Sequence, residues 1–369
     1  MSDACKHQNG MNKKITLLLP VSNQPRYLKR IHLLVKLGYH ITVYYFDRDL
    51  QVPEMDGSQL QFKKLGAIRD GNYLKRMLPL LKAVRIIKKD RSPVVYAFSV
   101  DLLLAAVLAG KSDIIFEIGD IREVKSTLFN RIYARLLKKC SRIIVTSDKF
   151  ASYLSETYRV DPHKFVFQPH LLEKHQFDAK SRVRNKTLRS GDALYVGFIG
   201  LLRYTSVGRL LEETHDNPRL KIRIHGRGAY RDEVAEKMNT SKDYFGGAFN
   251  YPEDLRKIYE SIDINFVMYD SSDTNVTMAL PNKLYESIYF GTPLIVSSGT
   301  YLSEIVQEWE IGLVWDYNRI NTLCEYLSSK EFRDQYPEMV RNVIGIPDDD
   351  ILRKKDELPE LFANLEPQH

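Results

Sequence analysis

The chain has 369 residues, 44% of them apolar, with 54 Lys and Arg against 47 Asp and Glu. This composition can bury a large core, which excludes a disordered chain or a mini-protein, and the length is about twice the ~150 residues of a typical domain. The net charge of +7 is uneven, because residues 1–180 carry 31 basic and 17 acidic side chains and the rest carries 23 and 30. The two halves are therefore expected to face different partners.

Short apolar, β-branched runs alternate with amphipathic stretches such as residues 27–37 in the first half. Runs of this kind read as buried strands, and the alternation is typical of a parallel sheet with crossover helices. The predicted strands are 15–19, 41–46, 94–98, 114–117, 143–146 and 166–168. The pattern then lapses into a polar stretch at 169–192, which we interpret as a linker.

The alternation restarts in the second half. Strands are predicted at 193–199, 221–225, 264–269, 294–297 and 312–315, with helices near 207–214, 254–261, 282–290 and 301–308. The expected fold class is α/β, with two doubly wound Rossmann-like domains facing across a cleft at the carboxyl ends of their sheets. The expected boundaries are an N-terminal Rossmann-like domain at 1–170, a linker at 171–192, a C-terminal Rossmann-like domain at 193–345 and a tail at 346–369 that packs back on the N-terminal domain.

The cysteines and the lengths of the apolar runs indicate the cellular compartment of the protein. The three cysteines, Cys5, Cys140 and Cys324, form no CxxC pair, so neither a disulfide framework nor a zinc site is indicated. The longest apolar run, residues 102–109, is far shorter than the ~20 residues needed to span a bilayer, and no secretory signal is evident. A cytoplasmic protein is expected, and no zinc-protease, α/β-hydrolase or P-loop motif is present.

The most informative segment is ALPNKLYESIYFGTPLIV, at residues 279–296. Pro281 suits the first helical position, Gly291 suits a left-handed C-cap and Pro293 prevents continuation, so a short helix at 282–290 is expected.

A lysine in the first turn of that helix suits an anion. Lys283 and Glu286 are three residues apart, so they lie on one side of the helix, and its amino end favours negative charge. A surface ion pair on an amphipathic helix is the alternative reading.

This segment resembles the donor-binding motif of GT-B glycosyltransferases of the retaining family-four type, also called glycosyl transferases group 1. The resemblance implies that Glu286 accepts hydrogen bonds from the ribose hydroxyls, that Lys283 neutralises the diphosphate and that Asn282 belongs to the donor site. The family often has a second glutamate where this chain has Met278, so the sugar contact passes to the backbone after Asn275. No cofactor is implied beyond the donor, a nucleotide sugar of the UDP or GDP type.

A second match is VGFIGLLRYTS, at residues 196–206. A strand that ends at a glycine with a basic residue just beyond brings backbone amides and a cation to the sheet edge, where a phosphate can sit. Gly200 and Arg203 are therefore donor-site candidates. The alternative for Arg203 is a solvated side chain on an ordinary turn.

The resemblance continues through residues 224–228 and 246–255 and spans about 193–316. In the family the second of these segments passes the nucleobase, which implies that Phe249 and Tyr251 flank a uracil or a guanine. Both aromatic side chains also fit ordinary core positions.

The first half offers acceptor-side candidates in IIFEIGDIR, at residues 114–122. A strand that runs into Glu117 and Asp120 puts carboxylates at the carboxyl edge of the sheet. The segment resembles the place where the family has His-Asp, with Gly119 in place of the histidine. The resemblance makes Asp120 the residue that orients or deprotonates the acceptor hydroxyl, with Glu117 and Arg26 beside the acceptor. A helix N-cap is the alternative role for Asp120.

The reaction implied by the resemblance needs no metal. An Asp-x-Asp motif of the metal-holding GT-A kind occurs at residues 47–49, but it follows only the second strand, so we interpret it as a loop. In the GT-B reading Arg203, Lys283 and the helix dipole stabilise the departing diphosphate. The catalytic residues are then Asp120, Arg203 and Lys283, and a front-face route retains the anomeric configuration of the donor.

A basic amphipathic segment points to a membrane. Residues 74–91 contain seven basic side chains, and Leu78, Leu81, Val84 and Ile87 lie between them at helical spacing. Such a helix can lie on anionic lipid, and a solvated face over a buried apolar stripe is the alternative.

The sequence thus predicts a retaining hexosyltransferase on the cytoplasmic face of the cell membrane. Its acceptor is a surface polysaccharide, such as capsule or lipopolysaccharide, or a polyprenyl-linked glycan. A non-catalytic nucleotide-sugar-binding or scaffold protein is the alternative, because Met278 replaces a family glutamate. A basic nucleic-acid-binding protein is a weaker one, since no RRM, KH or zinc-finger signature appears, and nucleic acid is not an expected partner.

Overall fold

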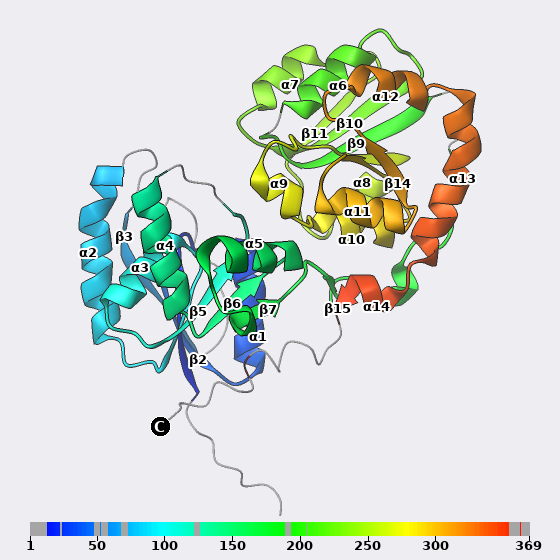
Figure 1. The fold of residues 1–369 in the computed structure, drawn as a ribbon. Helices are drawn as coiled ribbons and strands as arrows, with labels where there is room; N and C mark the ends of the chain where they lie inside the picture. Colours follow the sequence, from blue (N-terminus) through cyan, green and yellow to red (C-terminus); the bar gives the residue numbers. More distant parts are fainter. Residues whose placement is uncertain are drawn as a thin grey trace, which may run out of the picture. The chain divides into compact units, whose positions relative to one another are not determined.

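The computed structural model describes residues 13–22, 24–47, 52, 58–67, 73–121, 126–188, 193–203, 205–353 and 362. The chain divides into two compact units (Figure 1). Unit 1 comprises residues 1–168 and 356–369, and unit 2 comprises residues 169–355. Within the described ranges, no helix combines the length and the apolar character needed to cross a bilayer.

Unit 1 is built on a parallel sheet of seven strands in the order β3-β2-β1-β4-β5-β6-β7. The inner strands are buried because they are almost wholly apolar, as the sequence predicted, whereas the edge strand β3 was not predicted. The strands are β1 Lys14–Leu19, β2 His40–Asp47, β3 Leu60–Ala67, β4 Val94–Ala97, β5 Asp113–Ile118, β6 Arg142–Val145 and β7 Phe165–Phe167.

Helices connect these strands, and α2, α3 and α4 lie side by side (Figure 1). Two of the helices begin at serine caps, because the Ser99 hydroxyl accepts from the Leu102 amide and that of Ser126 accepts from the Phe129 amide. The helices are α1 Pro25–Lys36, α2 Tyr73–Lys89, α3 Val100–Leu108, α4 Thr127–Lys139, α5 Asp148–Tyr158 and the 3₁₀ turn η1 Pro162–Lys164.

Phe362 returns from the end of the chain to the core of unit 1. Its side chain is buried, its ring packs against Tyr96 and Tyr39, and its carbonyl accepts a hydrogen bond of 3.0 Å from the Tyr39 hydroxyl. The core of unit 1 is therefore closed by a residue that follows the whole of unit 2 in the sequence.

Unit 2 has a parallel sheet of six strands in the order β11-β10-β9-β12-β13-β14. Five of these strands were predicted, and the edge strand β11 was not. The strands are β9 Leu194–Leu201, β10 Leu220–Arg227, β11 Tyr244–Gly247, β12 Ile264–Val267, β13 Leu294–Ser297 and β14 Gly312–Trp315.

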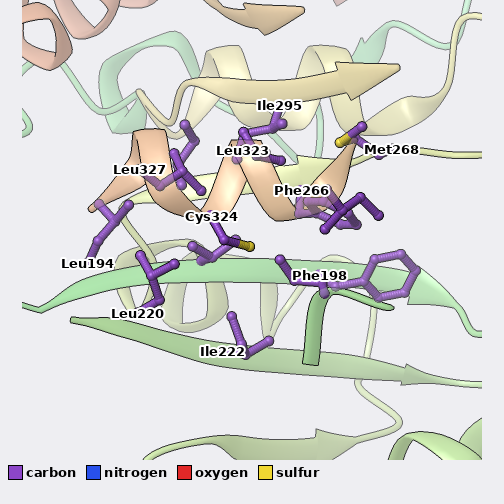
Figure 2. Packing of buried hydrophobic residues seen from close by; sticks show 14 of the residues in the cluster. Leu194, Phe198, Leu220, Ile222, Phe266, Met268, Ile295, Leu323, Cys324 and Leu327 are labelled. Atoms are coloured by element: carbon purple, nitrogen blue, oxygen red, sulfur yellow. The ribbon is translucent and has the colours of Figure 1, made fainter. Parts of the chain in front are cut away.

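The helices of unit 2 cover this sheet. One face packs on α12, where Leu323, Cys324 and Leu327 meet Phe198, Ile222 and other apolar side chains of the strands (Figure 2). The helices are α6 Ser206–Thr214, α7 Arg231–Lys237, α8 Leu255–Glu260, α9 Thr274–Met278, α10 Asn282–Tyr289, α11 Tyr301–Glu308, α12 Ile320–Leu327, α13 Lys330–Gly345 and α14 Asp348–Ile351.

The segment at 169–192, which we interpreted as a linker, belongs to unit 2. Strand β8, Leu172–Glu173, pairs with β15, Leu352–Arg353, and the 3₁₀ turn η2, Ala179–Ser181, follows it. A few apolar side chains in this polar stretch are enough to hold it, because Leu171, Leu172 and Phe177 are buried against the core of unit 2.

The buried Arg182 fastens the same segment to the end of α13. Its guanidinium donates to the carbonyls of Val343, Ile344 and Ile346 and to the carboxylate of Asp348. The predicted tail at 346–369 is therefore divided, with residues up to 355 in unit 2 and the remainder assigned to unit 1.

Candidate functional site

Helix α10 has the boundaries that its sequence predicts, within one residue. Pro281 lies at the N-cap, Asn282 is the first helical residue, and Gly291, with φ of +63°, follows the C-cap Phe290. A left-handed conformation of this kind suits glycine, so the helix ends where the predicted cap is. Its first turn has no acidic residue, and its amino end keeps its partial positive charge.

Lys283 and Glu286 form a buried ion pair on this helix. The Lys283 ammonium is 2.6 Å from Oε2 of Glu286, whose side chain is 0% exposed, whereas 13% of the Lys283 side chain is exposed. The alternative of a surface ion pair is therefore excluded. A buried charge of this kind needs its partners, so the two residues act as one unit.

The same carboxylate oxygen of Glu286 accepts a hydrogen bond from a second donor. The Tyr259 hydroxyl, at the end of α8, donates to Oε2 of Glu286 over 3.1 Å. Burial raises the pKa of Tyr259 well above its usual value, and the charge of Glu286 raises it further, so the phenol stays protonated and donates. The Asn265 amide, on β12, donates to the Tyr259 hydroxyl at 3.3 Å and to Oγ of Ser287 at 2.8 Å.

The other carboxylate oxygen of Glu286 is Oε1. Among the described residues, Oε1 has no hydrogen-bond partner although it is buried. An ionised carboxylate offers about four lone-pair sites, and a buried acceptor without a donor costs about 1–3 kcal/mol. Oε1 of Glu286 can therefore accept further hydrogen bonds, which suits a ligand with hydroxyl groups.

Gly200, at the carboxyl end of β9, lies beside the lysine. A Cβ on Gly200 would be 3.7 Å from Cε of Lys283. Gly226 on β10 is paired with Gly200, and a Cβ there would be 1.8 Å from the Gly200 carbonyl oxygen, so only glycine fits. The two glycine-containing segments that the sequence singled out, 196–206 and 224–228, thus meet at one sheet edge.

The two aromatic candidates lie near the same pair. The Lys283 ammonium is 5.9 Å from the centre of the Phe249 ring. Burial raises the pKa of the Tyr251 hydroxyl, and the negative charge of Glu286 adds to the effect. Both rings are partly buried and pack against the apolar core of unit 2, close to the ion pair.

Arg203 and Asn282 are exposed donor-site candidates. Asn282 opens α10, and Arg203 follows β9, where its amide donates to the Leu201 carbonyl. The structure thus brings Gly200, Phe249, Tyr251, Lys283 and Glu286 together, and it leaves the contacts of Arg203 with a ligand as a prediction.

In unit 1 the acceptor-side candidates surround Glu117. This residue of β5 is buried, and its carboxylate accepts from Arg30 at 3.0 Å and from the Tyr96 hydroxyl. Nε of Arg26 is 3.7 Å from its other oxygen. Burial alone would raise the pKa of Glu117, but the charges of Arg30 and Arg26 lower it overall. Glu117 therefore acts as the buried counter-ion of two arginines, and its place beside the acceptor stays a prediction.

Arg26 and Asp120 lie at the surface of this cluster. The Arg26 guanidinium is packed over Gly119, and its side chain is 23% exposed, while Asp120 is exposed. The charge of Asp120 also acts on Arg26. The alternative of an N-cap is contradicted, because the following helix α4 is capped by Ser126.

Several site residues were not predicted from the sequence. Tyr259 and Asn265 support Glu286, and Arg30 and Tyr96 support Glu117. One signal was available for Asn265, a polar residue inside the apolar strand INFV. The contact of Tyr259 with Glu286 could not be predicted from spacing, since the two are 27 residues apart in the sequence.

The Asp-x-Asp motif at 47–49 falls mostly outside the described residues. Its first member, Asp47, ends β2 and forms an ion pair with Lys64 of β3. In the parts of the chain that are described, no group of three or more His, Cys, Asp or Glu side chains is arranged to hold a metal ion.

The basic segment at 74–91 forms α2, but its apolar side chains are divided between core and solvent. Ile87 is buried, whereas Leu78 is 78% exposed and Leu81 is 50% exposed. The alternative of a fully buried apolar stripe is therefore wrong for these two leucines. On α4 the exposed Leu128 and Ile132 lie among basic residues, and neither helix contains an acidic side chain.

Comparison with known proteins gives a consistent result. No family model matches the chain. The succinoglycan biosynthesis protein ExoL of Rhizobium meliloti strain 1021 is 26% identical over 334 residues, which cover 82% of this chain and 81% of that protein.

Solved structures agree in fold. WaaG, a glycosyltransferase involved in lipopolysaccharide biosynthesis, is similar with a TM-score of 0.66 at 13% identity, covering 96% of this chain and 100% of WaaG. Sucrose-phosphate synthase from Thermosynechococcus elongatus has a TM-score of 0.67 at 16% identity, and the match covers 90% of this chain and 92% of the synthase. Anabaena HepE in complex with UDP-glucose has a TM-score of 0.67 at 13% identity, and the match covers 95% of this chain and 100% of HepE. The chain therefore has the GT-B fold of glycosyltransferases, with two Rossmann-like sheets, as the resemblance predicted.

Proposed function

We propose that this protein is a retaining, metal-independent glycosyltransferase that moves a hexose from a nucleoside-diphosphate sugar to a surface-polysaccharide or lipid-linked glycan. The observation that carries the proposal is the buried Lys283–Glu286 pair at the amino end of α10, with one carboxylate oxygen unused. The Lys283 cation suits the diphosphate of a nucleotide, and the adjacent Glu286 carboxylate, a hydrogen-bond acceptor, suits its ribose hydroxyls.

Each donor-site residue has a role in this proposal. Glu286 accepts hydrogen bonds from the ribose hydroxyls, and Phe249 and Tyr251 lie beside the nucleobase. Lys283, Arg203 and the amino end of α10 stabilise the negative charge that develops on the departing diphosphate. Electrostatic stabilisation of this kind replaces a metal ion, and the leaving phosphate helps to take the acceptor proton.

The acceptor is proposed to bind on unit 1. Asp120 orients or deprotonates its hydroxyl, and Arg26 contributes a cation whose position is fixed by Glu117 and Gly119. The names of the similar proteins support a role in polysaccharide synthesis, because ExoL is a succinoglycan biosynthesis protein and WaaG acts in lipopolysaccharide biosynthesis. HepE, solved with UDP-glucose, supports a UDP sugar as the donor.

The same proposal includes peripheral attachment to the cytoplasmic face of the membrane. Leu78 and Leu81 are exposed on α2 among Lys82, Arg85 and Lys88, which are exposed too. Exposed leucines between lysines and arginines are typical of a helix that lies in the surface of an anionic bilayer. Attachment there would hold the protein close to a lipid-linked acceptor.

Thermal-shift measurements with UDP, GDP and CMP sugars test the donor, since a ligand that binds the folded protein raises the unfolding temperature by an amount that grows with the ratio of its concentration to its dissociation constant. We expect one nucleoside-diphosphate sugar to stabilise the protein in the presence of EDTA. Transfer of radiolabelled sugar to a lipid extract then separates an enzyme from a scaffold that only binds the nucleotide. No stabilisation by any of these donors would refute the proposal.

A further inference from the structure

The carboxylate proposed to bind ribose is buried. The Glu286 side chain is 0% exposed, and that of Lys283, its ion-pair partner, is 13% exposed. The ribose role proposed for Glu286 requires hydroxyls within hydrogen-bond distance of a carboxylate that solvent does not reach. A side chain must therefore move before a ribose can bind.

The rear of the site is fixed. Tyr259 and Glu286 are fully buried, and Asn265 ties the Tyr259 hydroxyl to Ser287, one residue after Glu286 on α10. These four side chains come from α8, β12 and α10 and pack inside the core of unit 2. Movement of the Glu286 carboxylate would break its buried hydrogen bond from Tyr259, which is costly to lose.

Lys283 is the side chain that can move. It has a flexible four-carbon stem, which passes Gly200 where no Cβ narrows the space. Its described partners are the Glu286 carboxylate at 2.6 Å and the face of Phe249 at 5.9 Å. A rotamer change of Lys283 breaks these two contacts and frees the ammonium.

We propose that the nucleotide enters by an exchange of partners, which rests on the function proposed above: the Lys283 ammonium leaves Glu286 for the diphosphate, and the ribose hydroxyls take its place on the carboxylate. Neither group is left without a partner, because the diphosphate binds the ammonium and the ribose hydroxyls donate hydrogen bonds to the buried carboxylate. Oε1, which has no described partner, accepts a hydroxyl, and Oε2 keeps the bond from Tyr259.

The exchange predicts how each half of the ligand, a nucleoside or pyrophosphate, binds when it is alone. A nucleoside alone has to displace Lys283 from Glu286 and gives the ammonium no anion in return. Pyrophosphate alone has to draw Lys283 away and leaves Glu286 without its counter-ion. Each fragment therefore competes with the ion pair. Removal of the Lys283 ammonium should strengthen nucleoside binding, and removal of the Glu286 charge should strengthen pyrophosphate binding.

Calorimetry on the full chain tests this with UDP, uridine and pyrophosphate as probes, or with GDP and guanosine if UDP does not bind. For Lys283→Ala we expect UDP affinity to fall about tenfold or more, the loss of a charged hydrogen bond, while uridine affinity rises about threefold. For Glu286→Gln we expect UDP affinity to fall and pyrophosphate affinity to rise by a similar factor.

Control variants keep the outcome clear. Lys283→Met retains the stem without the charge and should give the same signs as the alanine variant. Lys257→Ala removes an exposed lysine of α8 and should change none of the three affinities. Thermal unfolding verifies that each variant is folded.

The two proposals fail in different ways. If the wild-type protein binds UDP or GDP but Lys283→Ala leaves uridine binding unchanged or weaker, and Glu286→Gln does the same for pyrophosphate, the exchange is wrong and the donor site stands. If the wild-type protein binds neither nucleotide, both are wrong.

Discussion

The guanidinium of Arg26 occupies the space that a side chain on Gly119 would fill. A Cβ on Gly119 would be 1.4 Å from Nη1 of Arg26. Arg26 is held there by the charge of Glu117, and Asp120 is the next residue along the chain. The absence of a side chain at position 119 therefore permits a cation and an exposed carboxylate to lie together at the end of β5.

Alanine at position 119 should disturb acceptor use without unfolding unit 1. The clash falls on the flexible end of Arg26, so the fold can adjust by moving that side chain. We expect transfer to the acceptor to fall by about ten- to a hundredfold, as for other displaced positioning groups, with UDP affinity unchanged. Gly345→Ala, where a Cβ meets open space, is the control. An unaltered transfer rate in Gly119→Ala would exclude a role for Arg26.

Tyr259→Phe should weaken both stability and ribose recognition. The change removes a donor from Oε2 of Glu286 and an acceptor from Asn265, both buried, so we expect unfolding to become easier by about 1–3 kcal/mol. The specific readout is the ratio of affinities for UDP and 2′,3′-dideoxy-UDP, which should shrink in the variant. A stability loss with an unchanged ratio would mean that Tyr259 supports the core but does not position Glu286.

Glu117→Gln should destabilise unit 1 in a pH-dependent way. It leaves Arg30 buried without its counter-ion, a loss of about 3–5 kcal/mol for a broken buried pair. The folded-state pKa of Glu117 is below its usual value of 4.5, so its contribution is complete above pH 4.5 and is lost as the pH falls through the lowered pKa. Denaturant unfolding of both proteins between pH 3 and 8 checks this. A difference in stability that persists unchanged at the acid end would contradict the assignment.

Replacement of Lys82, Arg85, Lys88 and Lys89 by serine should release the protein from anionic vesicles. Each basic residue near such a surface contributes about 1 kcal/mol, so four changes should abolish weak attachment. Sedimentation with phosphatidylglycerol vesicles measures it, with neutral phosphatidylcholine vesicles as the reference. The matched control replaces four basic residues of unit 2, Arg219, Lys257, Lys330 and Arg341. Equal sedimentation of the α2 variant and the wild-type protein would leave α2 as a solvated face.

Leu78 and Leu81 give an independent check of the same surface. Both are exposed, so Leu78→Ser with Leu81→Ser should leave unfolding nearly unchanged while reducing vesicle binding. A purely electrostatic attachment would be insensitive to this pair and would disappear in high salt.

The strands predicted from the sequence are mainly those with continuous apolar runs. The short pair β8 and β15 was missed, and so were β3 and β11, each at the edge of one of the two large sheets. Most side chains of β3 are not buried, and β11 contains Gly246 and Gly247, so neither resembles a buried strand. The polar stretch at 169–192 misled for a related reason, because three buried apolar residues and the buried Arg182 fasten it, while its other described residues are exposed or half-buried.

The site was predictable where it is local in sequence. Pro281 and Gly291 delimit α10, and the spacing of Lys283 and Glu286 places them on one side. The burial of that pair was not predictable, since it depends on Tyr259 and on the end of β9. Glu117 shows the same limit, because its partner Arg30 is 87 residues away.

The return of Phe362 to unit 1 has a consequence for synthesis on the ribosome. The strands of unit 1 emerge first, yet the aromatic contact of Tyr96 with Phe362 can form only after all of unit 2 has been translated. Unit 2, which is continuous in sequence, can finish folding earlier. The half of the protein that is made first is therefore the last to be completed.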